Sequence, residues 1–104
     1  MNVKTAATIL IAEDNDVSRE MMAKILQTQG YEIVHAVDGN EAIAAIRRLD
    51  IDIALVDINM APVSGFEFAR YTKSNGYSFP IVLVTGTNSS DILYEANAIG
   101  VAHV

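Results

Sequence analysis

The sequence predicts an α/β protein built around a parallel sheet, and three observations lead to this fold class. Short apolar segments rich in β-branched residues alternate with longer segments of helical periodicity, which is the order of βαβ units. Three of the short segments are nearly continuous apolar runs, as expected for strands covered on both faces. Glycines follow the helical segments or separate the elements, as at helix ends and in turns.

Four strands and four helices account for most of the chain. The expected strands are Thr8–Ala12, 31–36, Ile53–Asp57 and 80–85. The expected helices are 17–29, 40–49, 64–73 and 90–99.

Caps and stops agree with these segments. Asp16 is the expected N-cap of the first helix, and Asp38 suits a loop or a helix start. Gly30 and Gly100 follow the first and last helices as C-terminal glycines do. Three other glycines are expected in turns: Gly39, Gly76 and Gly86.

Right-handed connections between such units predict a doubly wound, three-layer α/β/α sheet of the flavodoxin-like order 2-1-3-4-5. A length of 104 residues suits one domain, 1–104, with its core in 8–104. A fifth strand would begin only at residues 101–104, so we expect the fifth strand and fifth helix to be largely missing.

Composition excludes several classes of function. The net charge is −6 and Lys and Arg form no cluster, which argues against direct binding to nucleic acid. The absence of cysteine excludes disulfides, thiolate metal sites and thiol redox chemistry. No apolar run is long enough to span a membrane, so we expect a soluble, cytoplasmic protein.

Carboxylates follow two strands that should be neighbours. Glu13 and Asp14 come directly after the first strand and Asp57 ends the third, so all three should meet where the strand order reverses. Clustered carboxylates repel one another unless a cation intervenes, and they suit Mg²⁺. The alternative is that Glu13 and Asp14 are solvated loop or capping residues. Asp50 and Asp52 precede the third strand and are expected in surface turns at the opposite edge.

Asp57 is the best placed of the three to act as a nucleophile. A carboxylate can attack phosphorus to give an acyl phosphate, and the apolar strand before Asp57 fixes its position. Thr85 would add a hydroxyl at the end of the neighbouring strand. The alternative is that Thr85 is an ordinary β-branched strand residue.

Three pieces in order resemble the response-regulator receiver family of two-component signalling. They are Glu13-Asp14 after the first strand, residues 57–60 with Gly65 eight places past the aspartate, and Thr85-Gly86 after an apolar strand. The resemblance covers residues 8–104. The sequences of the first two motifs are most similar to those of receivers that belong to, or work with, hybrid sensor kinases.

The resemblance implies a phosphoacceptor domain that is not an enzyme but assists its own phosphorylation and dephosphorylation. Asp57 would receive a phosphoryl group from a histidine kinase or a histidine phosphotransfer protein. Asp14 and Asp57 would bind Mg²⁺ directly, with the backbone carbonyl of Asn59, and Glu13 would act through water. Thr85 would reorient toward the phosphoryl group and pass on the signal.

Two departures from the family pattern carry expectations of their own. Pro62 stands one place later than the usual proline, so the loop over the site should be reshaped. The family's lysine would fall beyond Val104. Val104 itself stands where many receivers carry an aromatic switch residue. We therefore expect impaired switching, and a homodimer or aggregation through the uncovered edge of strand 80–85.

Rival functions fit the motifs less well. A haloacid-dehalogenase phosphatase would have a second aspartate where Asn59 stands. A flavin-binding flavodoxin would need a phosphate-cradling loop where residues 13–16 are acidic. A degenerate receiver that acts as a non-switching interaction module stays open. We interpret two histidines as strand residues and three methionines as packing residues: His35, His103, Met21, Met22 and Met60.

Overall fold

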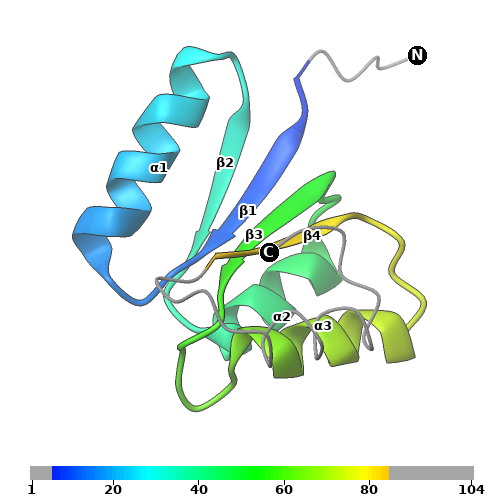
Figure 1. The fold of residues 1–104 in the computed structure, drawn as a ribbon. Helices are drawn as coiled ribbons and strands as arrows, with labels where there is room; N and C mark the ends of the chain where they lie inside the picture. The colour runs from blue at the N-terminus through cyan, green and yellow to red at the C-terminus, as the bar shows by residue number, and fades with distance from the viewer. Residues whose placement is uncertain (1–5, 85–104) are drawn as a thin grey trace, which may run out of the picture.

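The structure, a computed structural model, describes residues 6–84. Seven elements follow one another in the order β1 Thr8–Ala12, α1 Asp16–Thr28, β2 Glu32–Ala36, α2 Gly39–Arg48, β3 Ile53–Asp57, α3 Gly65–Ser74 and β4 Ile81–Val84. All strand pairs are parallel, and the strand order is β2-β1-β3-β4 (Figure 1). The predicted fold class and strand order are confirmed over these residues.

Several predictions concern residues that the structure does not describe. These are the helix at 90–99, the start of a fifth strand, and the placement of Thr85, Gly86, Gly100 and His103. Association through the β4 edge depends on the same part of the chain and stays a prediction.

Helices cover both faces of the sheet, in three layers. Of the three helices in residues 6–84, α1 packs on one face, while α2 and α3 lie together on the other (Figure 1). The larger core lies under α2 and α3, where Phe68 and Leu10 are fully buried. The smaller core, under α1, joins Ala23 of the helix to Ile9 and Ile11 of β1. Strand β1 is buried along its whole length because it lies between two other strands and two helical layers.

The helix starts differ in detail from the prediction. Asn15, not Asp16, is the N-cap of α1, because its side chain accepts a hydrogen bond from the Ser18 N–H at 2.9 Å. Asp38 caps α2 as expected, but Gly39 is the first residue of that helix and does not lie in a turn. Close packing accounts for this glycine, since a Cβ atom there would lie 2.5 Å from Cγ1 of Val63.

Other predictions about single residues have mixed outcomes. Gly30 and Gly76 both have positive φ angles, of 89° and 77°, as expected for a helix C-terminus and a turn. His35 lies in β2, and Met60 is buried in the larger core. Met21 was predicted to pack and does not, because it lies on the outer face of α1 and is 60% exposed.

Asp50 and Asp52 lie at the edge of the sheet where the strands begin, and both are exposed as expected. Asp52 does more than occupy a turn. Its carboxylate accepts a hydrogen bond from the Thr8 N–H at 2.7 Å, and its own N–H donates to the Thr8 carbonyl at 2.9 Å. These two bonds tie the start of β3 to the start of β1. Between residues 6 and 84, no helix has the length and apolar character that crossing a membrane requires.

Candidate functional site

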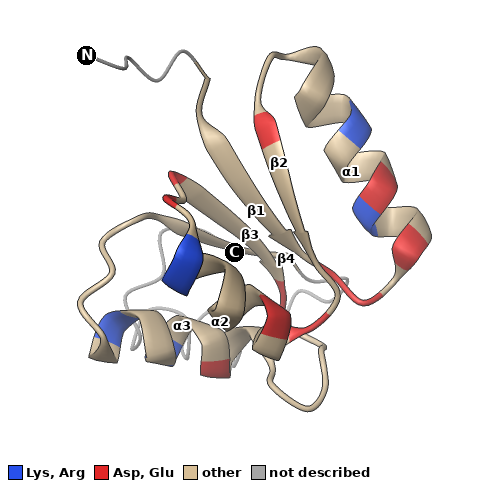
Figure 2. Ribbon diagram, turned by 180° about the vertical axis from the view of Figure 1, so that it is seen from behind, with Lys and Arg blue, Asp and Glu red and all other residues tan. Residues whose placement is uncertain are grey.

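Three carboxylates meet where β1 and β3 end. Glu13, Asp14 and Asp57 each offer an oxygen atom, and these atoms all lie within 4.8 Å of one another. Figure 2 shows acidic residues gathered at this end of the sheet, whereas every Lys and Arg of residues 6–84 lies on a helix. The cluster is therefore an acidic site to which β1, β2, β3 and β4, as described, contribute no lysine or arginine.

Strand register explains why Glu13 and Asp57, 44 places apart in the sequence, come together. Ala12 is paired with Val56 across the two strands, so the next residues, Glu13 and Asp57, leave the sheet at the same level. Strand β1 ends one residue before Glu13, and β3 ends at Asp57 itself. The position of Asp57 is thus fixed on both sides, by β1 and by its pairing with Val84 of β4.

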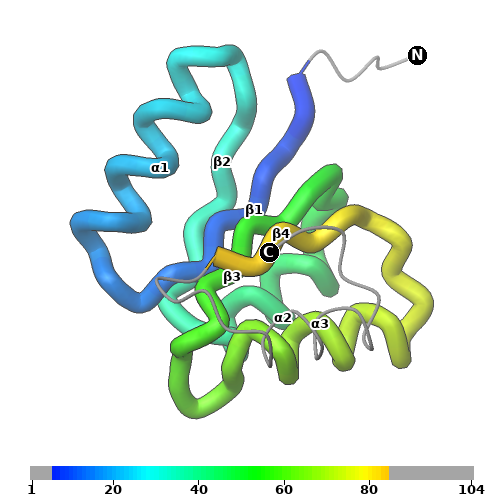
Figure 3. Tube along the Cα trace, viewed as in Figure 1, coloured from blue at the N-terminus to red at the C-terminus, as the bar shows by residue number. Residues whose placement is uncertain are grey.

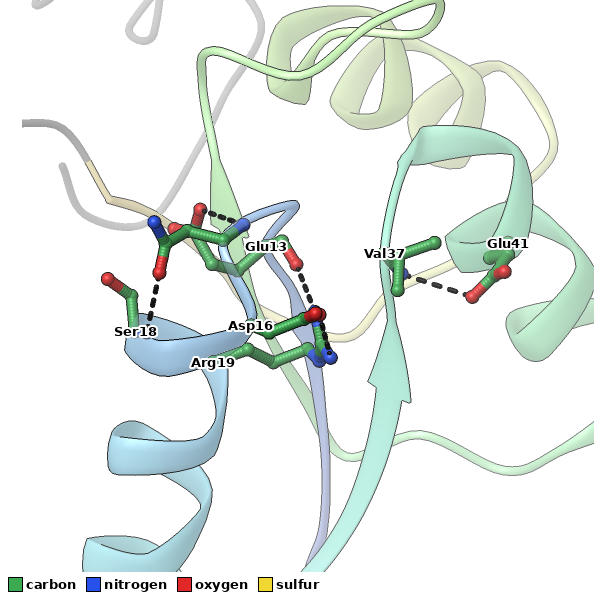
Figure 4. A network of polar contacts seen from close by, with 7 residues as sticks. Glu13, Asp16, Ser18, Arg19, Val37 and Glu41 are labelled. Atoms are coloured by element: carbon green, nitrogen blue, oxygen red, sulfur yellow. Dashed lines mark hydrogen bonds and ion pairs between the residues drawn. The ribbon is translucent and has the colours of Figure 1, made fainter.

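The loop that carries Glu13 and Asp14 is held by hydrogen bonds at nearly every step (Figure 4). The Glu13 N–H donates to the Ala36 carbonyl of β2 at 3.0 Å. The Glu13 carboxylate accepts from the Asn15 N–H at 3.1 Å. The Glu13 carbonyl accepts from Nη1 of Arg19 at 2.9 Å. This loop is therefore a fixed platform for its two acidic side chains.

Burial and neighbouring carboxylates perturb Glu13 strongly. Burial is the largest cause, and it raises the pKa of Glu13 to about 7, against the hydrogen bond from Asn15, which lowers it. Hydrogen bonds that the protonated form makes with Asp14 and Asp57 raise it further, as does the charge of Asp57. Glu13 is only 8% exposed, while Asp14 is exposed and Asp57 half-buried. The site thus holds more negative charge than its surroundings stabilise.

The loop from residue 58 to residue 64 lies over the end of β3 and leads into α3 (Figure 3). The Asn59 N–H donates to Oδ1 of Asp57 at 3.1 Å, which orients that carboxylate. The side chains of Ile58 and Met60 are buried in the larger core and anchor the loop. The Ala61–Pro62 peptide bond within it is cis.

Helix α3 begins directly after this loop and fixes its far end. Ser64 and Glu67 form a reciprocal capping box, in which each side chain accepts a hydrogen bond from the backbone N–H of the other. The Gly65 N–H donates to the Ile58 carbonyl at 3.1 Å. The two ends of the 58–64 loop are therefore held together, and Asp57 directly precedes this loop.

The donor set suits a hard divalent cation. Three carboxylates from two strand ends supply oxygen ligands, and burial together with the neighbouring carboxylates raises the pKa of Glu13. Asp14 is exposed, so an ion bound there would keep water ligands, as Mg²⁺ usually does. Glu13, Asp14 and Asp57 therefore fit Mg²⁺.

Comparison with known families bears on the same residues. Residues 9–104 match the response regulator receiver domain. This chain belongs to that family. The receiver domain described here thus has the fold and the acidic site at the ends of β1 and β3 that the resemblance led us to expect.

Two curated relatives illustrate where such receivers occur. The CAI-1 autoinducer sensor kinase/phosphatase CqsS of Vibrio cholerae is 38% identical over 88 residues, covering 82% of this chain. The response regulator GtcR of Aneurinibacillus migulanus is 33% identical over 81 residues, covering 78% of this chain. This chain spans 13% of the length of the first relative and 33% of the length of the second.

Solved structures give the same fold. The receiver domain superposes on the Vibrio cholerae chemotaxis protein CheY4 with a TM-score of 0.89 and 33% identity, covering 95% of this chain and 84% of that one. The Thermotoga maritima response regulator TrrA, solved in complex with Mg²⁺-BeF, has a TM-score of 0.84 and 28% identity. That comparison covers 93% of this chain and 83% of TrrA.

Sequence reasoning missed one residue of the receiver domain's site. Arg19 lies in α1, five residues after Asp14, and its guanidinium is buried against the acidic loop. The signal was present, since a cation in the first turns of a helix that follows an acidic pair stands out in a chain with seven Lys and Arg. Nothing in the sequence pattern said that its side chain would turn back toward Glu13.

Proposed function

We propose that this receiver domain accepts a phosphoryl group on Asp57, with Mg²⁺ bound beside it, as one step of a two-component phosphorelay. One observation carries the proposal: the carboxylate of Asp57 lies at the end of β3, an inner strand of the sheet, with oxygens of Glu13 and Asp14 within 4.8 Å. Membership of the receiver family supports phosphoacceptor function in general. The assignment of that function to Asp57 is our inference from the geometry.

The chemistry proposed for Asp57 is a direct displacement at phosphorus. An oxygen of the Asp57 carboxylate attacks the phosphorus of the donor, forming an acyl phosphate, while the bond from phosphorus to the histidine nitrogen breaks. The electron pair of that bond stays on the leaving imidazole. The Asn59 N–H holds Oδ1 of Asp57, which sets the direction from which a donor approaches the other oxygen.

Mg²⁺, when bound, would neutralise charge on the oxygens of the phosphoryl group during transfer. Asp14 and Asp57 are the proposed direct ligands, with the backbone carbonyl of Asn59, and Glu13 would act through water. TrrA, which is 28% identical and shares the fold, was solved in complex with Mg²⁺-BeF, and this supports Mg²⁺ as the ion. Thr85, outside the described residues, is the proposed hydroxyl that responds to the phosphoryl group.

The proposed partners are a sensor histidine kinase or a histidine phosphotransfer domain. Relatives of this chain include the sensor kinase/phosphatase CqsS and the response regulator GtcR, so receivers of this kind occur in both settings. We propose a signalling role for the domain rather than an enzymatic one, in the cytoplasm and without direct contact to nucleic acid or membrane. Residues 1–104 would act as one unit.

Mg²⁺-dependent labelling by a small phosphodonor separates this function from that of a non-switching interaction module. Acetyl phosphate should add one phosphoryl group to the protein in the presence of Mg²⁺ and none in the presence of a chelator. Intact-mass spectrometry at matched times gives the labelled fraction. A protein that stays unlabelled in Mg²⁺, while a known receiver is labelled in the same reaction, would contradict the proposal.

A further inference from the structure

The structure holds a buried arginine beside the acidic loop that the phosphoacceptor chemistry does not use directly. Arg19 is 8% exposed, which is unusual for a charged side chain. Its Nη1 donates to the backbone carbonyl of Glu13 at 2.9 Å, and its Nη2 pairs with Oδ1 of Asp16 at 2.6 Å (Figure 4). Within residues 6–84, its buried Nε has no hydrogen-bond partner.

Packing alone does not explain a guanidinium at this place. Burying a charge is costly, and an apolar side chain of similar length would fill the space without an unpaired Nε. The ion pair with Asp16 does not offset this cost well, because the Asp16 side chain is 76% exposed and solvent screens the pair. The bond to the Glu13 carbonyl is the buried contact of the guanidinium.

That carbonyl belongs to the peptide unit that joins the two acidic residues. A peptide unit is planar, so an atom that holds the Glu13 carbonyl also fixes the orientation of the Asp14 N–H and Cα. The Glu13 N–H is already held by Ala36 of β2 at 3.0 Å. With Arg19 on one side and Ala36 on the other, the backbone of Glu13 is held at both its N–H and its carbonyl, which fixes the direction in which Asp14 leaves the peptide.

Arg19 is tied to the same loop at a second point. Its own N–H donates to the Asn15 carbonyl at 3.0 Å, as the first turn of α1 requires. Asn15 in turn holds the Glu13 carboxylate through its N–H at 3.1 Å. The loop is therefore closed through the first turn of the helix, and the Arg19 side chain is the link that returns from the helix to Glu13.

We propose that Arg19 is a positioning residue of the metal site: by holding the Glu13 carbonyl it fixes the Glu13–Asp14 peptide, and so sets the distance between the Asp14 and Asp57 carboxylates. It touches neither the cation nor the phosphoryl group. The inference rests on the proposed function, since it assigns a role to Arg19 in Mg²⁺ binding at that site. Residues that orient metal ligands from outside the ligand set commonly matter tenfold to a hundredfold for affinity.

The test compares three variants with the parent protein in Mg²⁺ titrations, followed by the amide NMR signals of residues 13–15 and 57–59. Arg19→Met keeps the length of the side chain and removes its donors, so Mg²⁺ should bind at least about tenfold more weakly. Arg19→Lys keeps one donor for the Glu13 carbonyl and should recover part of that loss. Arg47→Met removes an exposed positive charge from α2 and should leave Mg²⁺ affinity within about threefold.

Thermal unfolding of each variant without Mg²⁺ separates positioning from stability. A purely structural Arg19 would lower the melting temperature of Arg19→Met while the folded protein bound Mg²⁺ as tightly as the parent, and that result would overturn the inference. Should Arg19→Met fail to fold, Arg19→Gln decides, because its shorter side chain should not span the distance to the Glu13 carbonyl, so unchanged affinity in that variant is equally contrary. A parent protein that binds no Mg²⁺ would overturn the proposed function as well, whereas a parent that binds it normally confines any failure to Arg19.

Discussion

Gly65 lies directly against the backbone of Asp57. A Cβ atom at position 65 would be 2.5 Å from the Asp57 carbonyl oxygen and 2.9 Å from Cα of Ile58. Real Cβ atoms do not approach backbone atoms so closely, and backbone cannot move aside as a flexible side chain can. The start of α3 thus reaches the end of β3 only because residue 65 has no side chain.

Gly65→Ala should therefore displace Asp57 or the start of α3. Forcing a methyl group into a packed region typically costs about 1–3 kcal/mol, and we expect the free energy of unfolding to fall by that order. Labelling of Asp57 by acetyl phosphate should also become slower, because the nucleophile moves relative to Glu13 and Asp14. Chemical denaturation and the rate of labelling measure the two effects.

Gly76→Ala is the matched control for Gly65→Ala. Gly76 has a φ of 77°, an added Cβ atom would meet nothing within 4 Å, and the residue lies beyond the far end of α3. Alanine there should destabilise the protein through backbone strain without slowing the labelling of folded protein. Equal labelling rates for both variants would show that the contact between Gly65 and Asp57 does not position the nucleophile.

The raised pKa of Glu13 predicts a pH dependence of stability in metal-free protein. Burial raises this pKa from its ordinary value of 4.5 to about 7, so the folded state binds more protons than the unfolded state between these pH values. Stability must then be greatest below about pH 4.5 for this group and decline as pH rises toward 7. The full effect is on the order of 3 kcal/mol. Urea denaturation at a series of pH values in chelator measures it.

Glu13→Gln isolates the contribution of this carboxyl to the pH profile. Glutamine has the same shape and does not titrate, so the decline in stability between pH 4.5 and 7 should be smaller than in the parent. Groups that do not interact with Glu13 contribute to the profiles of both proteins and cancel in the comparison. Superimposable profiles would mean that Glu13 has an ordinary pKa in the folded protein.

Mg²⁺ should stabilise the fold, because it binds carboxylates that folding brings together and unfolding separates. At a concentration one hundred times its dissociation constant, the gain should be about 2.7 kcal/mol. Asp14→Asn should remove most of this gain, yet raise stability without metal by relieving repulsion among the three carboxylates. Thermal unfolding with and without Mg²⁺ tests both statements. If Asp14→Asn gains as much from Mg²⁺ as the parent, Asp14 is not a ligand.

The sequence predicted most of the fold because the periodicity of apolar residues and the residues typical of helix and strand ends indicate the same elements. Strands Thr8–Ala12 and Ile53–Asp57 were placed to the residue, since buried parallel strands are continuous apolar runs with abrupt ends. The convergence of Glu13, Asp14 and Asp57 followed from topology, because neighbouring parallel strands end at the same edge.

The features that the sequence could not predict concern the exact start of helix α1 and the directions of its side chains. Asn15 is the N-cap of α1 because the helix begins at Asp16, one residue earlier than predicted. The sequence did not distinguish the two candidates, since Asn and Asp both cap helices well. Met21 was expected to pack, but only the position of α1 on the sheet decides which face is covered. The return of Arg19 to the Glu13 carbonyl is likewise a tertiary contact.

The central claim is that Asp57 is the phosphoacceptor, and mapping the labelled residue tests it most directly. The protein is incubated with acetyl phosphate and Mg²⁺, the acyl phosphate is reduced with borohydride, and peptide mass spectrometry locates the modified aspartate. Two variants run in parallel: Asp57→Asn, and Asp50→Asn at the opposite, exposed edge of the sheet. We predict modification at Asp57 in the parent and in Asp50→Asn, with none in Asp57→Asn. Labelling of Asp57→Asn to the level of the parent, or modification mapped to another aspartate, would contradict the account.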